Sequence, residues 1–162
     1  MTTKFFASGL PVTLNPSTTS WQTLNSAALS PAPNVGDVWQ VNARGTFSAG
    51  NSGYLLFYAI AAGNKVVLQF NPVAVAIDRA YDVTALCSVR SSASLSGAVV
   101  QCDGSLRWSN DAADAQDVSL STSTQSVNLS GTPLLSTQHK ILHADAAFTL
   151  TEQAAVFTVV AS

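Results

Sequence analysis

The chain contains very few charged residues. Only 10% of its 162 residues are Asp, Glu, Lys or Arg, whereas about 25% is usual for a globular domain. General acid, general base and metal-ion chemistry draw heavily on ionisable side chains, so this shortage argues for a structural or binding protein rather than an enzyme. The seven basic residues are scattered and the net charge is -2. Because nucleic-acid binding needs clustered Lys and Arg, no direct binding to nucleic acid is expected.

The sequence also lacks a long apolar run. Its first residues, MTTKFFASGLPVTLNP, hold no apolar segment of about 7 to 15 residues, which a secretory signal would have. The apolar stretch at residues 54–62 is roughly half as long as a membrane-spanning helix. We therefore expect a protein made in the cytoplasm, with no membrane partner and no cofactor. So low a charge leaves apolar surface exposed, which is typical of a subunit in an assembly.

Cysteine is scarce, since Cys87 and Cys102 are the only two in the chain. Both fall on the inward faces of predicted strands, and a turn near residues 93–97 would bring them nearly opposite each other. They could form a cross-strand disulfide or act as two small buried apolar side chains. The absence of a secretory signal favours the second interpretation. The sequence has no CxxC motif and no Cys/His cluster, so it predicts no zinc site.

What the sequence has in abundance is strict alternation of apolar and polar residues. In residues 39–47 the odd positions are Trp, Val, Ala, Gly and Phe, and the even positions are Gln, Asn, Arg and Thr. The same period of two returns in residues 81–90 and 100–108. Successive side chains of a strand point to opposite faces, so each segment is predicted to bury one face and expose the other.

Strands of this kind follow one another at short intervals, separated by turn sequences such as AGNSG and SGTP. No stretch of ten or more residues keeps a helical period with capping residues. The fold class is therefore predicted to be all-β, an antiparallel two-sheet sandwich with a jelly roll as the leading topology. The predicted strands are Val38–Ala49, Tyr54–Ala61, Lys65–Asn71, Tyr81–Arg90, Gly97–Ser109, Val118–Ser121, Ser126–Leu129, His143–Thr151 and Ala155–Ala161.

Residues 1–36 differ from the rest of the chain. They hold four of its six prolines and a polar turn sequence, NPSTTS. We interpret 1–36 as an N-terminal arm or edge hairpin and 37–162 as the sandwich domain. The arm carries apolar side chains whose exposure to water would be costly, and these are the candidate interface residues: Phe5, Phe6, Trp21 and Leu24.

Three segments and the closing residues of the chain resemble a group of tailed-bacteriophage virion proteins. The first is "W-x-V-x-A-x-G-T-F" at residues 39–47, followed by an apolar strand after a Gly-containing turn. "Y-x-V-x-A-x-x-x-V-R" at 81–90 and "G-x-V-V-x-x-x-G" at 97–104 follow, and "A-x-F-T-L-T" with "F-T-V-V" closes the chain. The resemblance covers residues 38–161 and implies a jelly-roll module on the phage particle, as a head decoration, head fibre or tail-fibre tip. It departs from the group at residues 110–117, where members usually have small residues, and it implies no catalytic residues.

Two groups of residues could in principle carry chemistry. His139, His143 and Asp145 with a serine could form a catalytic triad, but the sequence has no G-x-S-x-G motif. The two histidines are predicted to be solvent-facing residues of an edge strand, roughly 13 Å apart. Asn110 with Asp111, Asp114 and Asp117 is the acidic cluster of the chain. Its spacing does not match the calcium loop of a helix-loop-helix site, so a solvated loop is favoured over a bound cation.

Aromatic side chains could stack on sugars, and the chain has three tryptophans. Trp39 and Trp108 fall on inward faces and are predicted to lie in the core, which leaves Trp21 as the candidate for an exposed contact. A glycosidase would need two carboxylates about 5 to 10 Å apart. Asp82 and Asp103 are conceivable partners, but each shares its strand face with an arginine, so Asp82, Arg90, Asp103 and Arg107 are predicted to form cross-strand charge pairs.

Taken together, these features predict a non-enzymatic virion structural protein of a bacteriophage. No catalytic site, cofactor site or metal site is predicted. Its expected partners are its own copies, in a homotrimer, and the capsid or fibre proteins of the virion. The alternative function is a receptor- or glycan-binding tip module of a tail fibre, with a host-surface glycan as its partner.

Overall fold

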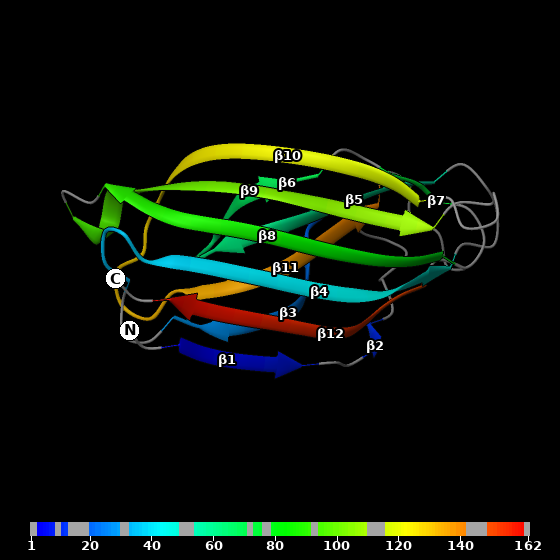
Figure 1. Ribbon diagram of the computed structural model, residues 1–162, viewed down its shortest axis with the longest axis horizontal. Helices are drawn as coiled ribbons and strands as arrows, with labels where there is room; N and C mark the ends of the chain where they lie inside the picture. The colour runs from blue at the N-terminus through cyan, green and yellow to red at the C-terminus, as the bar shows by residue number, and fades with distance from the viewer. Residues whose placement is uncertain are drawn as a thin grey trace.

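The computed structural model describes ten ranges of the chain: residues 3–8, 11–12, 20–29, 33–48, 54–70, 73–75, 79–91, 94–109, 116–141 and 149–160. Within these ranges the protein is an all-β sandwich of two antiparallel sheets, jelly-roll-like in arrangement, as the alternating sequence predicts. Figure 1 shows the two layers, with the larger sheet in front of the smaller one. No helix of the described residues is long and apolar enough to cross a membrane.

The larger sheet has seven strands in the order β1-β12-β4-β8-β9-β10, with β2 also paired to β12. Its central strands are long, because a sequence that alternates apolar and polar residues can bury one face over the whole length of a strand. The bounds are β1 Thr3–Ser8, β2 Pro11–Val12, β4 Val38–Ser48, β8 Arg79–Ser91, β9 Ala98–Ser109, β10 Gln116–Val127 and β12 Thr149–Val160.

The smaller sheet has five strands in the order β3-β11-β5-β6, with β7 also paired to β5. A single 3-10 turn, η1 at Leu95–Gly97, joins β8 to β9. The bounds are β3 Gln22–Ala28, β5 Tyr54–Ala62, β6 Lys65–Gln69, β7 Val73–Val75 and β11 Leu134–Ile141. The core lies between the two sheets, and its largest fully buried side chains include Trp39, Phe47, Tyr58 and Phe157.

Three stretches of strand differ from the prediction. Residues 116–127 form one strand, β10, instead of the two short strands predicted at 118–121 and 126–129. Its hydroxyl-rich sequence, SLSTSTQS, hides the alternation because serine and threonine occupy both faces. Strand β11 begins at Leu134, in a segment where no strand was predicted, because buried Ser136 and Thr137 look like exposed residues in the sequence. Residues 143–148 of the strand predicted at 143–151 lie outside the described residues, and its remaining residues form one strand, β12, with those of the strand predicted at 155–161.

The N-terminal region supplies an edge strand to each sheet. Strand β1 pairs with β12, where Phe5 is opposite Thr158 and Phe6 is opposite Phe157. Strand β3 pairs with β11 at the edge of the smaller sheet. Leu24 is 8% exposed and belongs to the core of the chain itself. The boundary drawn at residue 36 thus separates two edge strands from the strands that they pair with.

The two cysteines form a disulfide, which corrects the expectation that they would be separate buried thiols. They are directly opposite each other on β8 and β9, and both are fully buried. The alternation therefore predicted their juxtaposition correctly. The inference that they would stay reduced rested on the lack of a signal segment and not on their geometry, and it was wrong.

Candidate functional site

The most unusual side chain in the core is that of Glu152, which is 0% exposed. It lies at a β-bulge in β12, where the register against β4 shifts between Glu152 and Ala154. Before the bulge the even-numbered residues of β12 face the core, and after it the odd-numbered residues such as Phe157 do so. The extra residue, Gln153, is exposed. At the bulge a carboxyl group thus faces the core, and the inward-facing residues before and after it on β12 are apolar.

The two carboxylate oxygens of Glu152 together accept four hydrogen bonds, three from the smaller sheet and one from the larger sheet. Oε1 accepts from Asn25 Nδ2 at 2.7 Å and from Thr137 Oγ1 at 2.7 Å. Oε2 accepts from the hydroxyl of Tyr58 at 2.5 Å and from that of Tyr81 at 3.3 Å. Asn25, Thr137 and Tyr58 lie on β3, β11 and β5 of the smaller sheet, whereas Tyr81 lies on β8 of the larger one. The cluster therefore fastens one sheet to the other through a single acidic side chain.

Gly45 makes room for this cluster. It is the partner of Glu152 in the β4–β12 ladder and of Tyr81 in the β4–β8 ladder. A Cβ atom at Gly45 would lie 2.0 Å from the backbone oxygen of Thr151 and 2.8 Å from the Tyr81 ring and its hydroxyl. Only glycine lets the tyrosine pass over the strand and reach the carboxyl group.

Burial dominates the electrostatics of the cluster. It raises the pKa of Glu152, and the hydrogen bonds from Tyr58, Thr137, Asn25 and Tyr81 oppose that rise by stabilising the ionised form. Burial and the neighbouring carboxyl also raise the pKa of both tyrosines well above the usual value. The cluster is closed to solvent and every carboxylate oxygen is occupied by donors. The cluster therefore holds the two sheets together as a buried hydrogen-bond network.

His139 is buried, which corrects the prediction that it faces solvent on an edge strand. It is 0% exposed and lies on β11, which has β3 on one side and β5 on the other. It is opposite Tyr58 in the β5 ladder, and it has the same strand parity as Thr137, so it faces the core. Neither ring nitrogen has a hydrogen-bond partner among the described residues. Burial lowers the pKa of His139 to about 4, so the ring is neutral at pH 7.

The other residues of the predicted catalytic and acidic groups are mostly outside the described residues. His143 and Asp145 lie there, as do Asn110, Asp111 and Asp114. Asp117 is described and is exposed on β10. Within the described ranges, no group of three or more His, Cys, Asp or Glu side chains could hold a metal ion.

The three tryptophans have three different environments. Trp39 is fully buried, as predicted, while Trp108 is half-buried and packs against the core from its inward-facing position. Trp21 is half-buried, and the ammonium group of Lys140 lies 4.6 Å from its ring centroid and 5.0 Å from that of Phe57. A lysine thus already occupies a ring face of Trp21 in a cation–π contact. Whether this residue, Leu24 and the two phenylalanines of β1 contact another chain stays a prediction.

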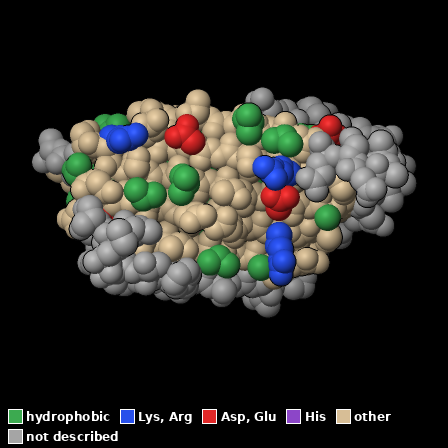
Figure 2. Space-filling model, viewed as in Figure 1, with side chains coloured by type: hydrophobic (Ala, Val, Ile, Leu, Met, Phe, Trp, Pro, Cys, Tyr) green, Lys and Arg blue, Asp and Glu red, His purple; other side chains and the backbone are tan. Residues whose placement is uncertain are grey.

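The outer face of the larger sheet is formed by the polar positions of β4, β8, β9 and β10. Figure 2 shows this face, on which charged side chains are few and side chains of opposite charge lie next to one another in one place. Three large apolar side chains are exposed on it: Leu86 on β8 at 50%, and Val118 and Leu120 on β10 at 50% and 74%. Most of the remaining positions are Ser, Thr, Asn or Gln.

The charged residues of this face are arranged differently from the predicted pairs. Arg90 Nε donates to Gln101 at 2.9 Å, and Asp103 accepts from the hydroxyl of Thr122 at 2.5 Å. Asp82 is opposite Arg107 in the β8–β9 ladder and opposite Arg44 in the β4–β8 ladder. Two of the four predicted residues are therefore bound to neutral side chains instead of to charged ones.

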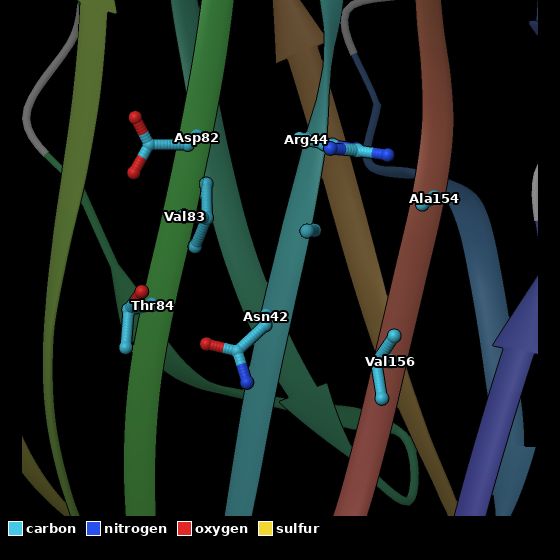
Figure 3. Close-up of a pocket in the computed structure, with 8 residues that line it drawn as sticks. Asn42, Arg44, Asp82, Val83, Thr84, Ala154 and Val156 are labelled. Atoms are coloured by element: carbon cyan, nitrogen blue, oxygen red, sulfur yellow. The ribbon is translucent and has the colours of Figure 1, made fainter.

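A shallow hollow of about 320 Å³ lies on the same face across β12, β4 and β8. Its rim carries Asn42, Arg44, Asp82 and Thr84, and Ala154 and Val156 provide apolar surface (Figure 3). A second hollow of about 230 Å³ shares Arg44 and Asp82 with the first and extends to Tyr81, Trp108, Ser109 and Gln153. The two hollows share Arg44 and Asp82 and together form one groove on the outer face of the larger sheet.

Sequence reasoning missed both Glu152 and the groove. Glu152 was taken for part of a turn, although a signal was present: the inward parity is even at Leu150 and odd at Phe157, and such a change of phase requires a bulge between them. The groove combines residues from three strands that are far apart in sequence. Its recognition required the cross-strand register, which alternation alone does not supply.

No protein-family model matches this sequence, and no curated protein matches it. Among solved structures, arcelin-5, a lectin-like defense protein from Phaseolus vulgaris, is similar with a TM-score of 0.39 and 10% identity over 98% of this chain and 93% of that chain. A legume lectin-like domain from Entamoeba histolytica has a TM-score of 0.33 and 7% identity over 94% of this chain and 88% of that chain.

Proposed function

We propose that the protein is a non-enzymatic structural subunit of a bacteriophage virion, a capsid decoration or fibre protein that binds the particle and its own copies as a homotrimer. The observation that carries the proposal is the outer face of the larger sheet, where Leu86, Val118 and Leu120 are exposed on a surface made mostly of Ser, Thr, Asn and Gln. The sequence resemblance to tailed-phage virion proteins supplies the setting.

Such a face suits a permanent contact between proteins. Charged groups are expensive to remove from water unless they are paired, whereas hydroxyl and amide groups need only hydrogen-bond partners. Depletion of charged residues at the centre is a general mark of protein interfaces. On this face, the exposed leucines provide the apolar centre and neighbouring residues such as Ser105 and Thr122 provide the polar surround.

The energetics favour repeated contacts over a single one. Complete burial of one leucine side chain contributes about 1.5–3 kcal/mol, so three exposed apolar residues on the face give several kcal/mol. Association costs about 4–15 kcal/mol in lost translational and rotational freedom. A closed ring of subunits, in which each chain makes two contacts, overcomes this cost more readily than an isolated pair.

The interior of the sandwich holds this face in one shape. The disulfide joins β8 to β9 directly beneath it, and the Glu152 cluster fastens the larger sheet to the smaller one. A surface that is already ordered before it binds loses less conformational entropy on binding. These internal links therefore support a role in binding without chemistry.

The test is sedimentation of the purified chain at tens of micromolar, together with co-sedimentation with particles of the phage that encodes it. We expect an oligomer, and we expect Leu86→Ser with Leu120→Ser to give monomers that no longer bind particles. Leu134→Ser is the matched control, because Leu134 is 48% exposed but lies on β11 of the other sheet. A monodisperse monomeric wild type would refute self-association, and undiminished particle binding by the double variant would refute the role of this face.

A further inference from the structure

Strand β10 forms one edge of the larger sheet. Among the described residues it pairs with β9 on one side and with no strand on the other. Its 12 residues keep one register against β9 without a bulge. A sheet edge leaves every second backbone N–H and C=O group without a ladder partner, and natural edges are protected by shortness, lysine, proline or a bulge. The sequence of β10, QDVSLSTSTQSV, has none of these protections.

The backbone groups on the free side of β10 belong to its even-numbered residues. The ammonium group of Lys65, on β6 of the other sheet, donates to the backbone oxygen of Ser126 at 3.0 Å. That oxygen therefore points away from β9. In an antiparallel ladder the N–H and C=O of one residue point to the same side, and alternate residues point to opposite sides. Because Lys65 covers the edge at Ser126, the free span is residues 116–124.

Leu120 lies at the middle of this free span. It is 74% exposed, more than any other large apolar residue described. The span carries one charged residue, Asp117, near its beginning. The hydroxyl of Ser121 donates to the backbone oxygen of Gln69 on β6 at 2.6 Å, so the middle of β10 is tied to the smaller sheet. The edge is therefore ordered before it binds, which lowers the entropy lost on binding.

A second copy of the same strand complements this edge. Antiparallel pairing about a two-fold axis at Leu120 places each Leu120 opposite the other and Val118 opposite Thr122. Even-numbered residues then meet even-numbered residues, so the outer faces of both copies stay on the same side. Each Asp117 comes opposite Ser123 near one end of the ladder. No like charges are therefore brought together, which would weaken a cross-strand contact.

The size of this contact is sufficient for a stable pair. A ladder over residues 116–124 would contain about ten backbone hydrogen bonds, and a typical protein interface also has about ten direct hydrogen bonds. The pairing also brings Val118 and Leu120 of both copies together on one continuous outer face. The apolar area on that face is then larger than the area one copy presents alone.

Strand β1, at the other edge of the larger sheet, fits β10 less well. It has six residues and would leave part of β10 unpaired. A contact between β10 and β1 joins two different surfaces and continues from copy to copy, whereas a contact between two β10 strands closes after two copies. The two-fold contact therefore satisfies the β10 edge of every copy at once.

We infer that β10 is an interaction surface for a second copy of this chain, with the two strands antiparallel about a two-fold axis at Leu120. The larger sheets of the two copies then form one continuous sheet. This contact goes beyond the proposed homotrimer and does not depend on it, because it uses the edge of the sheet and not the centre of its face. Two-fold and three-fold contacts are compatible in an assembly of three such dimers.

The first test is cross-linking of the full chain through an introduced cysteine. Directly opposite residues of a hydrogen-bonded pair have Cα atoms about 5.5 Å apart, which is within the range of a disulfide. We expect Leu120→Cys to form a covalent dimer under oxidised glutathione, seen on a non-reducing gel. Thr124→Cys is the matched control, because Thr124 is exposed on the same strand and face, but its two copies would be roughly 27 Å apart along the ladder. Cross-linking of neither variant, or of both equally, would overturn the inference.

The second test measures the dissociation constant of the dimer by sedimentation equilibrium in a Leu86→Ser background, which alters the face but not the edge. Leu120→Lys places two ammonium groups opposite each other, and we expect it to raise the dissociation constant tenfold or more. Thr84→Lys adds the same charge to an exposed position of β8, which is paired on both sides, and should have little effect. Equal effects of the two lysines would overturn the inference. So would a monomeric Leu86→Ser chain, whereas a dimer that no longer binds particles would support the edge contact.

Discussion

Protonation of His139 should destabilise the fold below neutral pH. The ring is fully buried with no hydrogen-bond partner among the described residues, and burial lowers its pKa from 6.5 to about 4. In the unfolded chain the ring takes up a proton as the pH falls through about 6.5. In the folded protein it stays neutral until about pH 4. As the pH falls between these two values, the free energy of unfolding therefore decreases.

The size of the effect follows from the shift. One pKa unit corresponds to about 1.36 kcal/mol, and the folded and unfolded values differ by 6.5 minus about 4. The contribution of His139 to the free energy of unfolding is thus fully present above pH 6.5, and roughly 3 kcal/mol of it is lost by pH 4. Glu152 acts in the opposite sense, because its raised pKa gives a contribution that is present at low pH and lost as the pH rises through the folded value.

Urea denaturation at pH 7, 6, 5 and 4 measures this contribution if the wild type is compared with His139→Leu. Glu152 and His143 are present in both proteins, so their titrations cancel in the difference. We expect the wild type to lose roughly 3 kcal/mol relative to the variant between pH 7 and pH 4. A difference that stays constant over this range would show that His139 is not held neutral by burial, and the reasoning would be refuted.

Three more predictions concern the interior and can be measured by urea denaturation. Glu152→Leu should lower the free energy of unfolding by about 3–5 kcal/mol, because Asn25, Tyr58 and Thr137 would lose their acceptor. Glu152→Gln should lower it by less, and equal losses for the two variants would contradict this prediction. Gly45→Ala should cost about 1–3 kcal/mol or more by overpacking, and an unchanged midpoint would show that Tyr81 does not need the space. Replacement of both cysteines by alanine should cost about 3 kcal/mol, the value for a closed loop of 15 residues, and a cost near zero would mean that the disulfide does not form.

The long strands of the larger sheet were predictable because each has one buried face and one solvent-exposed face. In β8, for example, burial alternates with every residue from Tyr81 to Val89. Prediction failed where a polar side chain is buried. Thr137 and His139 made β11 look like an exposed segment, although tertiary hydrogen bonding and packing hold both inside.

The Glu152 cluster could not be assembled from the sequence for a different reason. Its members come from five strands, and their meeting depends on the pairing of the two sheets and on one bulge. Alternation says which face a residue occupies but not which residue it meets across the core. The groove has the same origin, since the juxtaposition of Arg44 and Asp82 is a property of register.

The way in which β1 joins the larger sheet affects how the protein responds to tension. The first residue of β1, Thr3, is the register partner of Val160 at the end of β12, and the N and C labels lie at the same end of the sandwich (Figure 1). A pulling force applied between these two ends therefore breaks the hydrogen bonds of the β1–β12 ladder one residue pair at a time. Strand β1 consequently separates from β12 at low force. A force applied across the outer face of the larger sheet instead meets many ladder hydrogen bonds at once. The sandwich is thus mechanically weak when stretched by its ends and strong when held by its face.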